Sequence, residues 1–213
     1  MIRESLAPVL AAVVAALIVP SALGAVFNVS NPSEFQSALT SAESNGQDDV
    51  INVEPCSGSG CTTIDGTSAY AIDNTLEYTA SGGENQSLTI DGFDSDTRIL
   101  DGAMGVPILR IDTRTSGTDF GAAVTVTGLT FVNGNAVASS DDGGALAILV
   151  DSAPIEVAAS VFARNAADDE GGALYIIQEG AVEFPIRVRD VTFAENEARG
   201  VSSGGGGGNG GAA

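Results

Sequence analysis

The sequence predicts an all-β fold, a parallel β-helix, from three observations. A strand-like segment that begins at Val124 returns at Ile155 and again at Ile186, 31 residues later each time. Glycine is abundant, with 27 residues, whereas aromatic residues make up only 5% of the chain. The apolar residues are mostly Val, Ile, Leu and Ala, a composition typical of many short strands joined by tight turns.

The repeat also predicts how these strands stack. When one strand returns at a fixed interval, the simplest arrangement lays each copy ~4.8 Å above the previous copy. Positions that face inward then form columns of similar side chains, and the alternate positions face solvent. The expected inward columns are Val124/Ile155/Ile186, Val126/Val157/Val188 and Phe131/Phe162/Phe193. On the outer face, we expect Glu156 to form an ion pair with Arg187, worth only ~0–1 kcal/mol because it is exposed.

Each copy leads through a polar corner and an acidic loop to a Gly-Gly-Ala corner and a second strand. Gly143 and Gly171 begin two such corners, 28 residues apart. Glycine lets the backbone turn where a side chain would be in the way. Leucine-rich repeats are the competing architecture, but their unit is only about 20–29 residues long and their leucine spacing is missing here.

Residues 1–24 are expected to be a secretory signal peptide. Arg3 gives a weakly positive start, and the apolar run Leu6–Val19 is followed by small residues and a preferred cleavage site after Gly24. Cleavage after Ala25 is the alternative. The apolar run has 14 residues, fewer than the ~20 that cross a bilayer. We therefore expect no membrane span in the mature chain.

Residues 25–49 are expected to form a short strand and then a helix. Asn31 is a suitable N-cap, Pro32 fits the first helical position, and Glu34 has the spacing of a capping box. Asn45-Gly46 should end this helix of about three turns. Its apolar face consists of Phe35, Ala38, Leu39 and Ala42. Such an amphipathic helix is a suitable cap for the open end of a strand stack.

Residues 50–203 are assigned to the β-helix coils, and residues 204–213 to a glycine-rich loop that begins a further coil. The chain is thus expected to be truncated within a coil. Asp-Gly pairs recur where short apolar runs end, but they do not lie between strands of equal length. We therefore expect these pairs to form corners between parallel coils and not hairpins. The same turn chemistry accounts for Asp91, Asp94, Asp96 and Asp101.

The two cysteines of the chain, Cys56 and Cys61, enclose four Gly and Ser residues. In an exported chain, two cysteines alone favour a disulfide. A metal site made of two thiolates without histidine is improbable. We therefore expect a Cys56–Cys61 disulfide that closes a short loop.

The net charge is −20, from 28 acidic and 8 basic residues, and every basic residue is an arginine. A chain this acidic repels phosphate backbones and anionic lipid headgroups, which excludes nucleic acid as a partner. The charge is explained by solubility more readily than by cation binding.

The segments that resemble a known group are Gly143–Leu146 with Val161–Ala166, Gly171–Tyr175 with Val191–Asn196, and the opening Asn31–Ile51. They resemble polymorphic outer membrane protein repeats and the wider pectate-lyase-like β-helix superfamily. The resemblance covers residues 26–213 and implies a right-handed β-helix. It also implies a protein that is secreted or displayed on the outer-membrane surface of a bacterium.

Members of this superfamily include polysaccharide lyases and hydrolases as well as adhesin-like surface proteins. We expect a non-catalytic, adhesin-like protein that offers a binding or structural surface to carbohydrate or a cell-surface ligand, as a monomer. The enzymatic alternative is a polysaccharide lyase or hydrolase whose active site lies outside this chain or is poorly visible in it. A third hypothesis is a purely structural N-terminal fragment.

A lyase of this kind would need carboxylates that hold Ca²⁺ and a Lys or Arg base. Lysine is absent, and no arginine lies in a recognisable catalytic pattern. We therefore assign no catalytic residue and no required cofactor. Stacked acidic corners bring like charges together, which a hard cation or exposure to solvent would relieve. The candidate Ca²⁺ ligands are Asp141, Asp142, Asp168, Asp169 and Glu170.

Overall fold

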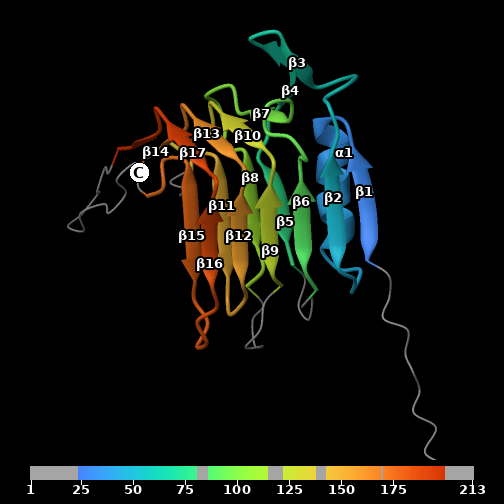
Figure 1. Ribbon diagram of the computed structural model, residues 1–213, viewed down its shortest axis with the longest axis vertical. Helices are drawn as coiled ribbons and strands as arrows, with labels where there is room; N and C mark the ends of the chain where they lie inside the picture. Colours follow the sequence, from blue (N-terminus) through green and yellow to red (C-terminus); the bar gives the residue numbers. More distant parts are fainter. Residues whose placement is uncertain (1–23, 81–85, 115–121, 138–142, 169, 200–213) are drawn as a thin grey trace, which may run out of the picture.

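The computed structural model describes residues 24–80, 86–114, 122–137, 143–168 and 170–199, and these residues are mainly β. They form three large sheets, which we call A, B and C, a two-stranded sheet D and one helix, α1 (Pro32–Ala42). Figure 1 shows the strands of each large sheet side by side, from blue or teal near the N-terminal end of the stack to orange or red at the other end.

The strands of each sheet follow one another in space in nearly the order of the sequence. Sheet A contains β1 (Ala25–Val29), β2 (Asp49–Val53), β6 (Leu88–Asp91), β9 (Val124–Thr127), β12 (Ile155–Ala158) and β16 (Ile186–Arg189). Sheet B contains β3 (Cys61–Ile64), β4 (Thr67–Ala71), β7 (Ile99–Asp101), β10 (Thr130–Val132), β13 (Val161–Ala163) and β17 (Thr192–Ala194). Sheet C contains β5 (Leu76–Thr79), β8 (Leu109–Asp112), β11 (Leu146–Val150) and β15 (Leu174–Gln178), and sheet D contains β14 (Ala166–Ala167) and β18 (Glu197–Ala198).

The chain visits the three large sheets in a fixed order. From β9 in sheet A it passes to β10 in sheet B and β11 in sheet C, and it returns to sheet A as β12. We call the chain from one strand of sheet A to the next a coil. The strand pairs within the sheets are parallel, except for β3 with β4. This arrangement is consistent with the predicted β-helix.

The predicted columns of inward side chains are confirmed. Ile155 lies opposite both Val124 and Ile186, and the next inward residues pair in the same way. The Phe131 and Phe162 rings stack with centroids 4.8 Å apart, and the Phe162 and Phe193 rings with centroids 5.2 Å apart. Stacked aromatic pairs stabilise a core beyond the area they bury. The 31-residue repeat thus sets the register of the sheets.

The predicted ion pair between Glu156 and Arg187 is wrong, because Glu156 pairs with Arg189. Arg187 lies directly opposite Glu156 in the sheet, but Arg189 makes the ion pair, with its Nε 2.8 Å from a Glu156 carboxylate oxygen. Arg189 lies opposite the small side chain of Ala158, which leaves room for it to lean toward Glu156. It also contacts Asp190, so its guanidinium lies between two carboxylates.

Asn165 is a buried asparagine that joins three successive coils. Its Oδ1 accepts from the N–H of Gly134 at 2.8 Å, and its Nδ2 donates to the carbonyl oxygen of Phe131 at 3.1 Å. Nδ2 also donates to Oδ1 of Asn196 at 2.9 Å. A buried amide is stabilising only when its hydrogen bonds are made. These bonds explain why asparagine recurs in the corner after each phenylalanine.

From β9 onward, two corners of the coils contain a residue with positive φ at the same place in the repeat. The first set is Gly128, Ala159 and Asp190, and the second set is Asn133, Arg164 and Glu195, each at 31-residue intervals. Residues other than glycine adopt this left-handed conformation at a cost. The recurrence shows that the corner geometry, set by stacking, overrides the preference of the individual residue.

The Gly-Gly corners are confirmed as places where a side chain has no room. A Cβ on Gly144 would lie 2.2 Å from the carbonyl oxygen of Gly172 and 2.3 Å from that of Ala166. These contacts are far inside van der Waals separation, so the corners of adjacent coils approach each other directly through the backbone.

One Asp-Gly pair corrects the expectation that none of them forms a hairpin. Strands β3 and β4 are antiparallel, and the two residues between them are Asp65 and Gly66. Their φ values are 49° and 85°, and a two-residue hairpin turn with two positive φ values is the one that Asp-Gly favours. The expectation failed because it compared strand lengths, whereas here β4 continues past its partner and also pairs with β7.

Helix α1 confirms the predicted start and ends earlier than expected. The Asn31 side chain accepts from the N–H of Glu34 at 3.0 Å. The Glu34 carboxylate accepts from the N–H of Ser30 at 2.8 Å, one residue before the N-cap, and this bond holds the pKa of Glu34 below its usual range. The helix ends at Ala42, with Glu43 as its C-cap, and the Glu43 carboxylate accepts from the N–H of Thr79 at 3.1 Å.

The buried face of α1 packs on the first strands of the stack. Its predicted apolar residues are buried, and the ring of Phe35 meets the edge of Tyr70 at a centroid distance of 6.4 Å. The buried Tyr70 hydroxyl lies 2.8 Å from the carbonyl oxygen of Val29 and 2.6 Å from that of Glu54. Burial raises the pKa of Tyr70. Within the described residues, the structure holds no helix with the length and apolar character needed to cross a membrane.

Candidate functional site

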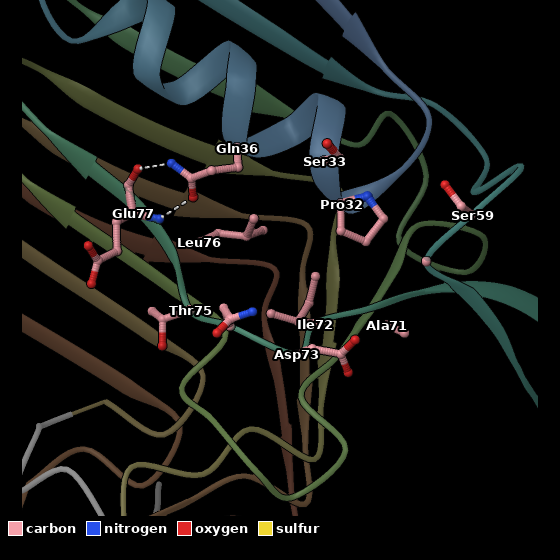
Figure 2. Close-up of a pocket in the computed structure, with 12 residues that line it drawn as sticks. Pro32, Ser33, Gln36, Ser59, Ala71, Ile72, Asp73, Thr75, Leu76 and Glu77 are labelled. Atoms are coloured by element: carbon pink, nitrogen blue, oxygen red, sulfur yellow. Dashed lines mark hydrogen bonds between the residues drawn. The ribbon is translucent and has the colours of Figure 1, made fainter.

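A hollow of about 470 Å³ lies where three segments meet. These segments are the first turn of α1, the loop between the cysteines and the connection between β4 and β5 (Figure 2). Its apolar lining comes from Pro32, Ala71, Ile72 and Leu76, and Ile72 and Leu76 are buried. We call this hollow the N-terminal cleft.

The rim of the N-terminal cleft is polar. Side chains with hydroxyl, amide and carboxylate groups surround the apolar floor, and all of them except the half-buried Gln36 and Thr75 are exposed. The polar residues that line it are Ser33, Gln36, Ser59, Asp73, Asn74, Thr75 and Glu77. Figure 2 shows the carboxylates of Asp73 and Glu77 on opposite sides of the cleft. An apolar floor with a few polar groups around it is the usual composition of a small-ligand site.

The predicted disulfide between Cys56 and Cys61 is confirmed, and Ser59 and Gly60 of the loop that it closes form one wall of the cleft. The N–H of Ser57 donates to the carbonyl oxygen of Ser30 at 2.8 Å, which attaches this loop to the residue before the N-cap of α1. At Gly60, with φ of 79°, an added Cβ would lie 3.0 Å from Cδ of Pro32. The disulfide therefore holds the loop against the start of the helix.

The opposite wall is fixed by Gln36. Its Nε2 donates to the carbonyl oxygen of Glu77 at 2.9 Å, and its Oε1 accepts from the N–H of the same residue at 2.9 Å. Both bonds are drawn in Figure 2. The amide of Gln36 thus takes the place of a neighbouring strand beside β5, and it sets the distance between α1 and the floor residue Leu76.

The charge of the cleft is negative. Asp73 and Glu77 line it, no arginine does, and the chain contains no lysine. Hydroxyl groups of a ligand can donate to these carboxylates and exchange hydrogen bonds with the amide and hydroxyl groups beside them. An anionic ligand would be repelled. Both carboxylates are exposed, so they are available as hydrogen-bond acceptors for a ligand in the cleft.

The predicted Ca²⁺ ligands are only partly within the described chain. Asp141, Asp142 and Asp169 lie outside the described residues, whereas Asp168 and Glu170 are half-buried beside the Gly171 corner. The carbonyl oxygen of Glu170 accepts from the N–H of Gly143 at 3.1 Å. Among the residues that the structure describes, no three Asp, Glu, Cys or His side chains are grouped to hold a metal ion. The Ca²⁺ site stays a prediction.

A charged cluster on sheet C and the segment after it involves Arg110, Asp112, Arg114 and Glu179. Arg114 donates to both oxygens of Asp112, at 2.9 Å and 2.7 Å, and to Glu179 at 3.3 Å. Arg110 donates to Asp112 at 3.2 Å. Burial opposes the charge of Asp112, but the hydrogen bonds and charge of Arg114 outweigh it and lower the pKa of Asp112. Because each charge has a partner, the cluster links sheet C to the segment after it by charge-assisted hydrogen bonds.

The turn roles predicted for Asp91, Asp94 and Asp101 are confirmed, whereas Asp96 joins its turn through its backbone N–H and not through its carboxylate. Asp91 Oδ1 accepts from the N–H of Phe93 at 2.8 Å, and Asp94 Oδ1 accepts from the N–H of Asp96 at 3.0 Å. Asp101 Oδ1 accepts from the N–H of Ala103 at 2.9 Å. A carboxylate that bonds its own backbone two residues later stabilises a turn.

The residues of the N-terminal cleft were not predicted as a site. They come from three segments of the chain, and their meeting depends on how α1 lies on β5. Two sequence features could have indicated it: the two cysteines enclose Ser59 and Gly60, and the N-cap Asn31 begins the helix that carries Gln36. No protein-family model, no curated protein and no solved structure matches this chain.

Proposed function

We propose that the protein is a right-handed parallel β-helix, exported to the surface of a bacterium, that binds neutral carbohydrate without catalysis. The observation that carries the proposal is the N-terminal cleft, with its apolar floor and its rim of carboxylate, amide and hydroxyl groups. Sugar rings present apolar faces and many hydroxyl donors, which match such a floor and rim.

Two features support the architecture in this proposal. The chain passes from sheet A to B to C and back to A with parallel pairing, and ~98% of parallel crossover connections are right-handed. At the N-terminal end of the stack, Gln36 of α1 and the C-cap residue Glu43 bond the outer backbone groups of Glu77 and Thr79. The helix then acts as the cap of the stack, because these groups would otherwise be an open strand edge.

The charge of the cleft selects among carbohydrates. With Asp73 and Glu77 on its rim and no basic residue in its lining, the cleft favours uncharged sugars over uronic acids. The first test is therefore isothermal titration of the full chain with neutral oligosaccharides and with oligogalacturonate. We expect heat of binding from a neutral sugar alone. Binding of oligogalacturonate alone, or release of shortened products, would overturn the proposal and favour a polysaccharide lyase or hydrolase.

A matched pair of variants locates the binding. Asp73 and Asp96 are both exposed, but only Asp73 lines the cleft. Asp73→Ala should weaken binding by about tenfold, since it removes a charged hydrogen-bond acceptor. Asp96→Ala should leave the affinity unchanged. Equal affinities of the two variants would place the binding site elsewhere.

A further inference from the structure

A second hollow, of about 440 Å³, lies between α1 and β1. We call it the β1 hollow. Its apolar lining comes from Val26, Phe27, Val29 and Ala38, of which Val29 and Ala38 are buried and Val26 is 60% exposed. Like the floor of the N-terminal cleft, this lining offers apolar surface to a ligand.

The rim of the β1 hollow is polar and acidic. The polar residues that line it are Asn28, Ser33, Glu34, Ser37 and Ser41, and all of them are exposed. No arginine lines this hollow, and the chain contains no lysine. The β1 hollow thus repeats the composition of the N-terminal cleft, with amide, hydroxyl and carboxylate groups around an apolar lining and no basic group.

Two residues of this rim keep hydrogen-bonding capacity for a ligand. Asn28 Oδ1 accepts from Nδ2 of Asn52 at 2.9 Å, but Nδ2 of Asn28 has no partner among the described residues. The carbonyl oxygen of Ser33 accepts from the Ser37 hydroxyl at 2.8 Å, whereas the Ser33 hydroxyl itself makes no bond within the described chain. An amide donor and a hydroxyl group are therefore available to a ligand.

The first turn of α1 separates the two hollows and also connects them. With about 3.6 residues per turn, Gln36 and Glu34 lie on opposite sides of the helix, and Gln36 lines the N-terminal cleft while Glu34 lines the β1 hollow. Ser33 lies between them and lines both hollows. Figure 2 shows Ser33 beside Pro32 on this turn. The surface between the hollows therefore crosses the helix over a small, exposed side chain.

From these observations we infer that the two hollows are subsites of one binding site for a neutral oligosaccharide, which crosses α1 at Ser33. The inference rests on the proposed carbohydrate binding and assigns it a second subsite. A helix with its side chains is ~10–12 Å wide, so a ligand that occupies both hollows is longer than a monosaccharide. One part of it packs on the floor of the N-terminal cleft and another part on Val26 and Ala38, while the Ser33 hydroxyl bonds the units between them.

The charge and polarity of both rims favour this ligand over others. Glu34, Asp73 and Glu77 line the hollows without any arginine, so an acidic polysaccharide or a phosphate would be repelled. A lipid chain would desolvate the amide and hydroxyl groups of the rims without replacing their hydrogen bonds to water, which is costly. The hydroxyl groups of a neutral sugar donate to the carboxylates and also accept from the Asn28 amide.

The dependence of affinity on ligand length tests the inference. The probes are cello-oligosaccharides and manno-oligosaccharides, from the disaccharide to the hexasaccharide, titrated calorimetrically into the full chain. Affinity should rise by about tenfold or more from disaccharide to hexasaccharide, because the second subsite adds contacts to a ligand that is already held. Equal affinity at all lengths would overturn the second subsite and leave the N-terminal cleft as the binding site. No binding by either series, or binding of a tetralysine peptide in their place, would overturn this inference together with the proposed function.

Three asparagine variants locate the second subsite. Asn28 lines only the β1 hollow and Asn74 only the N-terminal cleft, and both are exposed. Asn28→Ala should weaken hexasaccharide binding by about fivefold and leave disaccharide binding unchanged, whereas Asn74→Ala should weaken both. Asn52→Ala also removes the bond between Asn52 and Asn28, but Asn52 lines neither hollow, so this control should change neither affinity. A hexasaccharide affinity that Asn28→Ala leaves unchanged would contradict the inference.

NMR spectra of the unmodified chain give a readout that does not depend on a variant. The hexasaccharide should shift the amide signals of Ser37 and Ser41, which line the β1 hollow, together with those of Ser59 and Asn74, which line the N-terminal cleft. The disaccharide should shift only the second pair. A bound hexasaccharide that leaves Ser37 and Ser41 unshifted would overturn the second subsite.

Discussion

Gln36 binds both backbone groups of Glu77 with the two ends of one side-chain amide. Nε2 donates to the carbonyl oxygen and Oε1 accepts from the N–H, each at 2.9 Å. A primary amide has the donor and acceptor that a neighbouring strand would supply at this place. One residue of a helix thereby completes the hydrogen bonding of a strand edge.

Removing this amide should loosen the first end of the stack. We expect Gln36→Ala to lower the free energy of unfolding by about 1 kcal/mol, because water replaces the two bonds at an exposed site. Gln36→Glu should lower it by at least as much, since its carboxylate would face the carbonyl oxygen of Glu77. Urea unfolding measures both, and faster hydrogen exchange at Glu77 should accompany them. Unchanged stability in both variants would show that packing of Phe35 and Leu39 alone holds the helix.

Asn165 and Asn196 occupy the same place in successive coils but should differ in their contribution. Asn165→Ala leaves the buried N–H of Gly134 without its acceptor and removes one of the donors to Phe131, at a cost of about 2–4 kcal/mol. Asn196 is less buried, so Asn196→Ala should cost about 1–2 kcal/mol. Thermal or urea unfolding of the two variants side by side tests the difference. The reverse order would contradict this account.

Substitution by glycine should have opposite effects on stability at Ala159 and at the adjacent Ala158. Ala159 has φ of 45° and is exposed, so Ala159→Gly relieves a left-handed alanine and should stabilise the protein by about 0.5–1 kcal/mol. Ala158 is buried in β12, so Ala158→Gly should destabilise by about 1 kcal/mol. Melting temperatures should move in opposite directions. A shift of both in the same direction would rule out strain at Ala159 as the cause.

The ion pair between Asp112 and Arg114 predicts a pH-dependent contribution to stability. The folded-state pKa of Asp112 is below its usual value of 3.8, so the stabilisation is complete above the unfolded pKa and is lost as pH falls through the folded pKa. Arg114→Ala should cost about 1–2 kcal/mol at pH 7, and this difference should shrink below about pH 4.

Arg164→Ala is the control for this pH dependence. The Arg164 Nε donates to Oδ1 of Asn133 at 3.2 Å, and an amide does not titrate. Its effect on the free energy of unfolding should therefore be the same at pH 7 and pH 3. An Arg114→Ala effect that is equally independent of pH would show that Arg114 acts through packing and not through the charge of Asp112.

The repeat made much of the fold predictable. A residue that recurs every 31 positions must meet its own copies if strands are parallel, so the columns through Ile155 and Phe162 followed from spacing alone. The start of α1 was equally local, because Asn31 and Glu34 interact within one turn. Contacts that depend on how a long side chain is directed were less predictable. Arg187 lies opposite Glu156 as expected, but Arg189 makes the ion pair.

The N-terminal cleft could not be predicted from the sequence patterns of the segments that form it. Pro32, Ser59 and Asp73 line one cleft, but nothing in their own segments indicates that they meet. Their positions follow from the disulfide and from the bond of Gln36 to Glu77, and the second of these depends on where a helix lies on a sheet. Periodicity predicts which residues stack, and it contains no information on the surfaces that non-repeating segments add.

The separation between stacked residues also determines how the molecule would yield to mechanical force. Ile155 touches partners 31 residues away in each direction, so tension applied beyond Ala198 would first detach the last coil while the coils before it stayed paired. Each detached coil would lengthen the chain by ~100 Å. A single-molecule pulling trace should then show a series of regular small steps that begins at β16, and not one large rupture.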